Sequence, residues 1–188
     1  MNDKIRQNTP RERRAAKGVK TGREAAYVGV FVALLIATQL CFASIPGVEA
    51  VTVLFVAFSF SFGVKRSMIA ATVFSLLRQL VFGFYPTVLV LYLTYYNMSG
   101  VLFGFLGHKL QPNVKNLVFL TGLACVCTVF FTLFDNLLTP LWYGYSERVI
   151  KMYFYASLSF MLPQAICTAV TVGCLFLPLV KIFRIVQK

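Results

Sequence analysis

Six long apolar runs separated by short polar gaps make up most of the sequence after residue 24. They cover residues 25–44, 50–63, 67–83, 86–107, 116–140 and 152–182. The runs are too long and too uniformly apolar for the alternating strands of a membrane barrel, and about 20 apolar residues cross a bilayer as a helix. The pattern therefore predicts an all-α integral membrane protein with six transmembrane helices, the second of which is the shortest.

The composition supports a membrane protein over a soluble one. Hydrophobic residues make up 59% of the 188 residues and charged residues 13%, and the mean hydropathy is +0.76. Soluble domains contain about 45–50% apolar and about 25% charged residues. A soluble fold of this size has too little interior to bury so many apolar side chains, so we expect a multi-pass protein in which lipid takes the place of water.

Basic residues lie in alternating gaps, and this distribution predicts the orientation. Residues 1–23 form a basic tail before a membrane domain at 24–188, and further Lys and Arg lie at 64–67, at 108–115 and after 180. The remaining gaps hold only Arg148 and Lys151. The positive-inside rule then places the tail and both termini in the cytoplasm. This distribution of charge argues against nucleic-acid binding despite the net charge of +12. The first apolar run could also be a signal peptide, but this interpretation is less favoured because more apolar runs follow.

Polar side chains inside the apolar runs converge on the outer half of the predicted bundle. With a rise of about 1.5 Å per residue, Arg78 lies roughly 18 Å above Arg66, and Asp135 lies roughly 28 Å above Asn116. Charges in a membrane are costly and usually functional. We expect a cup that is open to the outside and closed by an apolar floor. The predicted ligand-binding residues are Glu49, Arg78, Tyr92, Tyr95, Asn97, Asp135, Asn136 and Gln164.

Two structural alternatives stay open at this point. Arg78 could pair with Asp135 or Glu49 only to hold helices together, although buried ion pairs are weak evidence for stability. Tyrosine and tryptophan side chains also gather at membrane interfaces without any ligand. A binding cup, by contrast, needs aromatic faces for a flat ligand and a few polar groups that orient it.

Small residues recur every fourth position along the first apolar run. This small-residue stripe consists of Ala25, Gly29, Ala33 and Ala37. It forms a smooth helix face on which another helix can approach closely. The stripe predicts either docking of a partner or packing within the bundle, and the glycines at 100, 104 and 107 fit the internal role better.

The chain resembles the substrate-binding S components of energy-coupling factor (ECF) vitamin transporters. The resemblance rests on six predicted spans in under 200 residues, on cytoplasmic termini, on the small-residue stripe, and on the segment IPGVEAVT at 45–52. It implies a bacterial plasma-membrane subunit that binds a vitamin or related micronutrient at the outer face. It also implies docking through the stripe onto a membrane coupling subunit driven by two ATPase subunits. The chain lacks a thiamin-type E-x-W-x-x-N signature, so the ligand stays open.

Catalytic motifs are absent from the sequence. It contains no GxGxxG, no phosphate-binding loop and no HExxH, and its five cysteines form no pair of CxxC motifs. We expect no enzyme activity, no cofactor and no metal, with ATP hydrolysis left to partner subunits. The alternatives are a gradient-driven transporter of the queuosine-precursor permease type and a non-transport membrane protein, such as a scaffold or a small intramembrane enzyme.

Overall fold

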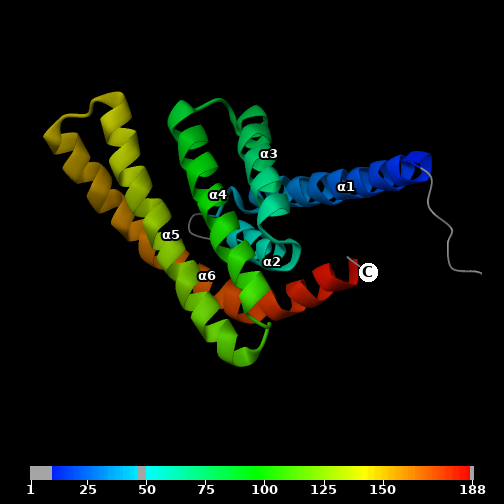
Figure 1. Ribbon diagram of the computed structural model, residues 1–188. Coiled ribbons are helices and arrows are strands. Elements are labelled where there is room, and N and C mark those ends of the chain that lie inside the picture. Colours follow the sequence, from blue (N-terminus) through cyan, green and yellow to red (C-terminus); the bar gives the residue numbers. More distant parts are fainter. Residues whose placement is uncertain (1–9, 46–49, 187–188) are drawn as a thin grey trace, which may run out of the picture.

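The protein is an all-helical bundle in the computed structural model, which describes the backbone of residues 10–45 and 50–186 and the side chains of 22–45 and 50–186 (Figure 1). The helices are α1 (Pro10–Phe42), α2 (Val51–Phe62), α3 (Val64–Phe82), α4 (Pro86–Lys109), α5 (Val114–Tyr143) and α6 (Glu147–Val186). The predicted all-α class and the presence of six helices are confirmed. Helix α1 begins at Pro10, well inside the segment 1–23 that the sequence predicted to be a basic tail before the membrane domain. Glu49 lies outside the described residues.

Four of the helices have the length and apolar composition of membrane spans. They are residues Gly22–Phe42 of α1, and the whole of α4, α5 and α6. Large apolar side chains cover the outside of the bundle; Leu80 is 82% exposed and Val118 is 74% exposed. A soluble monomer rarely exposes contiguous apolar surface on this scale. The chain is therefore a multi-pass helical membrane protein.

Helix α2 lies at the centre of the bundle and is the shortest of the six helices, as the sequence predicted. It has 12 residues, so it is about 18 Å long, against a hydrocarbon core of about 30 Å. It packs on α1, α3, α4 and α6, and Phe55, Val56 and Phe58 are almost completely buried. An apolar helix this short is accommodated because protein, and not lipid, surrounds it.

Glycines on α4 allow that helix to lie directly against the junction of α2 and α3. A Cβ atom added at Gly104 would lie 2.7 Å from the backbone nitrogen of Val64, and one at Gly107 would overlap the Phe60 carbonyl. Gly100 faces Ser67 in the same way, at 3.2 Å. The internal packing role predicted for these three glycines is therefore confirmed.

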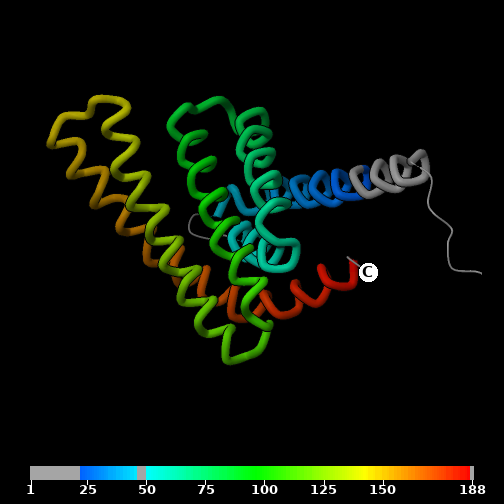
Figure 2. The backbone as a smooth tube through the Cα atoms, viewed as in Figure 1, coloured from blue at the N-terminus to red at the C-terminus, as the bar shows by residue number. Residues whose placement is uncertain are grey.

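The basic gaps of the chain meet at one end of the bundle. Arg66 of α3 forms a 2.8 Å ion pair with Glu24 of α1, and the Tyr27 hydroxyl donates to the Val186 carbonyl at the end of α6. Figure 2 shows the described ends of the chain on the same side of the molecule. Their common location agrees with the charge pattern, while their placement in the cytoplasm stays a prediction.

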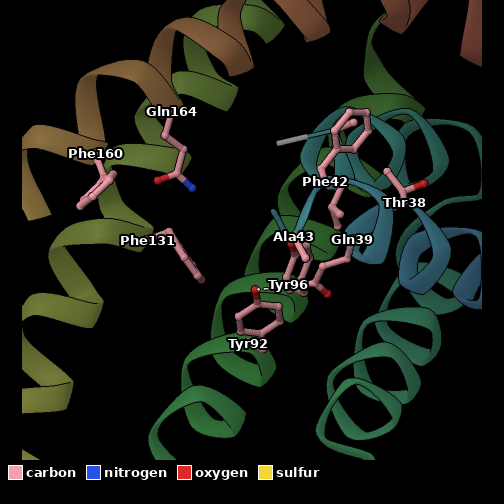
Figure 3. A pocket seen from close by; sticks show the side chains of 11 residues that line it. Thr38, Gln39, Phe42, Ala43, Tyr92, Tyr96, Phe131, Phe160 and Gln164 are labelled. Atoms are coloured by element: carbon pink, nitrogen blue, oxygen red, sulfur yellow. Dashed lines mark hydrogen bonds between the residues drawn. The ribbon is translucent and has the colours of Figure 1, made fainter. Parts of the chain in front are cut away.

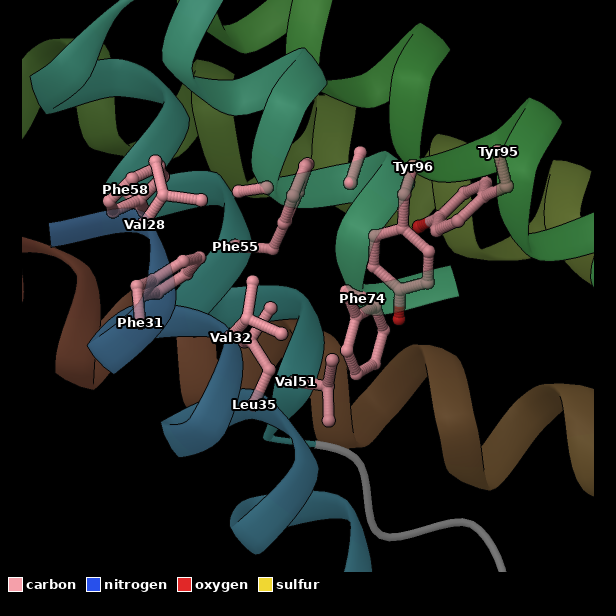
Figure 4. Packing of buried hydrophobic residues seen from close by; sticks show 12 residues of the cluster. Val28, Phe31, Val32, Leu35, Val51, Phe55, Phe58, Phe74, Tyr95 and Tyr96 are labelled. Atoms are coloured by element: carbon pink, nitrogen blue, oxygen red, sulfur yellow. The ribbon is translucent and has the colours of Figure 1, made fainter. Parts of the chain in front are cut away.

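The core face of α1 packs against α2 and α3, in a cluster that also includes Tyr95 and Tyr96 of α4 (Figure 4). Val28, Phe31, Val32 and Leu35 are buried there, and the Phe31 ring stacks on Phe58 with centroids 3.8 Å apart. These positions recur at three- and four-residue spacing, so they occupy one stripe of the helix. The opposite face of α1 remains open.

Helices α5 and α6 form a hairpin that diverges from α3 and α4 toward the α5–α6 turn (Figure 1). Residues 141–150 around that turn are all exposed. Polar contacts between the two helices recur along the hairpin, and we call them the polar ladder. They join Cys125 to the Ala165 carbonyl, Thr128 to Thr168, Thr132 to Gln164, Asp135 to Tyr153, and Asn136 to Ser157.

Candidate ligand-binding cavity

A cavity of about 280 Å³ lies where the end of α1 faces α4, α5 and α6 (Figure 3). We call it the first chamber. Its lining residues are Thr38, Gln39, Phe42, Ala43, Ala50, Val51, Tyr92, Tyr96, Phe131, Phe160 and Gln164. Aromatic rings and amide or hydroxyl groups line it together, which is the mixture that small-molecule sites use to enclose and orient a ligand.

Gln39 and Tyr92 fix one wall of the first chamber. The Gln39 side-chain nitrogen donates to the Tyr92 hydroxyl at 3.0 Å, which joins α1 to α4 (Figure 3). The Gln39 Oε1 atom is buried and has no hydrogen-bond partner. A buried acceptor without a partner costs free energy. This wall therefore presents an acceptor that a ligand or an ordered water molecule would satisfy.

A second chamber of about 300 Å³ lies between α5 and α6. Its lining residues are Phe131, Thr132, Asp135, Tyr153, Ala156, Ser157, Phe160 and Gln164. Phe131, Phe160 and Gln164 also line the first chamber. The two chambers therefore share a wall, and the aromatic rings at 131 and 160 lie between the polar groups of α1 and those of α5.

Asp135 is the charged residue of the second chamber. Its Oδ1 accepts a bond from the Thr139 hydroxyl at 2.7 Å, and its Oδ2 accepts one from the Tyr153 hydroxyl at 2.8 Å. Both donors are neutral, and no ion pair of Asp135 is found in the part of the chain that the structure describes. The carboxylate is thus held in a fixed orientation while its charge stays uncompensated.

Arg78 lies beside the first chamber, behind Tyr92, and does not line it. Its guanidinium carbon is 4.3 Å from the centre of the Tyr92 ring and 5.0 Å from that of Phe82. Its Nε and Nη1 atoms are buried and have no hydrogen-bond partner. Arg78 forms no ion pair with Asp135, so the proposed structural pairing of these two charges is wrong. A pairing with Glu49 falls outside the described residues.

The other predicted site residues divide between the chambers and a separate groove. Tyr92 and Gln164 line the first chamber, and Asn136 donates to Ser157, which lines the second. Tyr95 and Asn97 instead line an almost wholly apolar groove of about 660 Å³ between α4 and α5. In place of the single predicted cup there are two adjacent chambers with a shared wall, and Tyr95 and Asn97 lie outside them.

The sequence interpretation missed several lining residues. Gln39 is an uncharged polar residue inside the first apolar run, and Phe131 and Phe160 look like ordinary core residues in sequence. A usable signal did exist on α6, where Tyr153, Ser157 and Gln164 recur at helical spacing on one face. That face is the one that lines the second chamber.

The small-residue stripe of α1 lies on the open face of that helix. All four of its residues are exposed, and a Cβ atom added at Gly29 would meet nothing within 4 Å. Packing within the described bundle therefore does not explain the stripe. Docking of a partner stays a prediction.

Long apolar helices around a partly open cavity with an aromatic and polar lining define a multi-pass helical membrane protein with room for a small molecule. Comparison with protein-family models, with curated proteins and with solved structures found no match for this chain.

Proposed function

We propose that this protein is the substrate-binding S component of an ECF-type importer, which captures a vitamin or related micronutrient from the outside. The observation that carries the proposal is the pair of adjacent chambers, because aromatic rings, amides and a carboxylate line them inside a bundle of apolar helices. A purely structural bundle has no need of such a space. The type of transporter is inferred from the resemblance of the sequence to the S components of ECF transporters.

The open face of α1 supports the second half of the proposal. An S component has no nucleotide-binding motif of its own and depends on a coupling subunit with two ATPase subunits. The exposed small-residue stripe offers a smooth surface on which a helix of the coupling subunit would pack closely. The core face of α1 packs inside the bundle. Docking of a partner on the opposite face would therefore leave the bundle intact.

The decisive experiment separates binding from transport. The purified chain is analysed by native mass spectrometry for a small molecule that copurifies, and uptake of that molecule is then measured in vesicles with and without the ATPase and coupling subunits. We expect ATP-dependent uptake only when these subunits are present. Uptake by the chain alone, abolished when the ion gradient is collapsed, would instead establish a gradient-driven transporter, in which Asp135 is the candidate proton carrier.

The docking role of α1 is tested by Ala33→Trp, with Val118→Trp as the matched control. Both positions are exposed, but Val118 lies on α5, away from the stripe. We expect Ala33→Trp to retain ligand binding and to lose ATP-dependent uptake, while Val118→Trp retains both. Equal uptake by the two variants would contradict docking through the stripe.

A further inference from the structure

Asp135 carries a charge for which the described chain provides no counterion. Two hydroxyl groups donate to it, and the ion pair found among the described residues joins Arg66 to Glu24 at the basic end of the bundle. Arg78, the other charge well inside an apolar helix, contacts the rings of Tyr92 and Phe82 instead. An ionised carboxylate in a membrane protein is costly unless a partner or a cavity satisfies it.

The carboxylate is oriented so that it can accept a further pair of hydrogen bonds. A carboxylate has two oxygens with about four lone-pair sites. Thr139 and Tyr153 use one site on each oxygen, so each oxygen keeps capacity for another donor. Two parallel N–H groups on a planar cation match such a carboxylate in a bidentate manner.

The residues around Asp135 favour a ligand group that is flat. Phe131 and Phe160 line the wall shared by both chambers, and Ala156 leaves space beside the carboxylate. Flat rings pack on such aromatic walls, and a cation gains further attraction from the face of an aromatic ring. Thr132, which donates to Gln164 in the same wall, adds a hydroxyl group.

We propose that the second chamber recognises a flat ligand group that carries a positively charged, N–H-bearing nitrogen centre, such as an amidinium-like or protonated aminoheterocycle, and that Asp135 is its counterion. This inference rests on the proposed function and names the ligand class of the same cavity. Tyr153 and Thr139 hold the carboxylate in place, and the rings at 131 and 160 stack on the ligand. The first chamber receives the uncharged remainder of the molecule.

The test uses benzamidine and benzamide, which have nearly the same shape and differ in charge. Their dissociation constants are measured on the purified full-length chain in lipid nanodiscs. We expect benzamidine to bind at least tenfold more tightly than benzamide. We also expect Asp135→Asn to abolish this preference and Glu147→Gln to retain it, because Glu147 is an exposed acidic residue at the start of α6, outside the chamber. Equal binding of the two probes to the wild type, or a preference that survives in Asp135→Asn, would overturn the proposal.

A second variant covers the case in which Asp135→Asn does not fold. Ala156→Trp keeps the carboxylate and fills the second chamber, so we expect it to lose benzamidine binding; unchanged binding would place the cation elsewhere and overturn the proposal. The result is separable from the proposed function. If the wild type shows no charge preference but its uptake depends on the ATPase subunits, only the ligand class is rejected. If the wild type shows the charge preference but its uptake does not depend on the ATPase subunits, only the ECF assignment is rejected.

Discussion

The α3–α4 pair and the α5–α6 pair are both antiparallel helical hairpins, yet they are held together in different ways. Gly104 and Gly107 bring α4 into backbone contact with the junction of α2 and α3. The α5–α6 pair has no such contact at its glycines; a Cβ atom added at Gly122 or Gly173 would meet nothing within 4 Å. It is joined by the polar ladder instead.

The difference indicates which part of the molecule is rigid and which part can adjust. Close backbone packing leaves no room for movement, because any shift creates overlap or a void. Interhelical hydrogen bonds in membrane proteins average only about 0.6 kcal/mol each, and they re-form after small displacements. The first chamber lies between α1, α4 and the α5–α6 pair, and the second lies within the α5–α6 pair, so movement of α5 and α6 would change the size of both.

Each pair also holds one charge against a tyrosine of the partner helix. Arg78 of α3 lies over the ring of Tyr92 on α4, whereas Asp135 of α5 accepts a bond from the hydroxyl of Tyr153 on α6. The arginine contacts the face of one tyrosine ring, and the aspartate accepts a hydrogen bond from the hydroxyl group of the other tyrosine. Substitution of each tyrosine by phenylalanine therefore has different consequences in the two pairs.

The largest expected effect comes from breaking the close contact of the rigid pair. Gly104→Leu places a side chain where even a Cβ atom would lie 2.7 Å from the Val64 nitrogen, and we expect a loss of about 3 kcal/mol or more in the free energy of unfolding. Gly122→Leu is the control, because its position on α5 is open; it should change stability by less than about 1 kcal/mol. Unfolding by titration with a denaturing detergent measures both, and similar losses would contradict the steric account.

The next effect concerns the aspartate of the adjustable pair. Tyr153→Phe removes the 2.8 Å hydrogen bond to Asp135, and hydrogen bonds to charged groups contribute about 1.5–3 kcal/mol. We expect a loss in this range in the same unfolding measurement. Tyr145→Phe serves as the control, because it changes an exposed residue near the turn and keeps the ring that contacts Tyr153. A loss no greater than that of the control would show that the carboxylate does not depend on Tyr153.

A smaller effect is expected from substituting Tyr92, the tyrosine that contacts Arg78 in the rigid pair. Tyr92→Phe keeps the ring that lies 4.3 Å from Arg78 and removes the hydroxyl that accepts from Gln39. The expected loss is that of one neutral hydrogen bond, about 0.5–1.5 kcal/mol. Tyr92→Leu removes the ring as well and should cost clearly more. If the two variants lose equal stability, the contact between Arg78 and the ring contributes nothing.

The smallest expected effect comes from a single step of the polar ladder. Thr128→Val removes the 3.2 Å contact with Thr168, and the expected loss is about 0.6 kcal/mol. Thr171→Val is the control, because its hydroxyl bonds only to carbonyls of its own helix. A double-mutant cycle with Thr168→Val measures the coupling, and a coupling near zero would remove the ladder as an explanation of how α5 and α6 associate.

The sequence predicted the helices well because their apolar runs record contact with lipid or with core residues along their whole length. It predicted the close packing of α4 because glycines at 100, 104 and 107 share one face. It did not reveal that α2 is enclosed by other helices, since an apolar run looks the same beside lipid and beside protein. That information lies in the tertiary arrangement alone.

The candidate site could be predicted only in part, for a related reason. Polar residues in apolar runs marked Tyr92, Asp135 and Gln164 as unusual, and the structure places all three at the chambers. The rise per residue grouped these positions along the helices, but it did not give the direction of each side chain around its helix. Tyr95 therefore lies at the apolar groove between α4 and α5, and Arg78 contacts rings where an ion pair with Asp135 was considered.

Helix α6 has 40 residues, which corresponds to about 60 Å, roughly twice the thickness of the hydrocarbon core. It cannot lie entirely within the bilayer along the membrane normal. Its last turns, with exposed Lys181 and Arg184, belong at the level of the phosphate headgroups, where basic side chains attract anionic lipid. The tilt of α6 therefore depends on bilayer thickness and surface charge, and through Phe160 and Gln164 the lipid composition of the host membrane would set the width of the chambers.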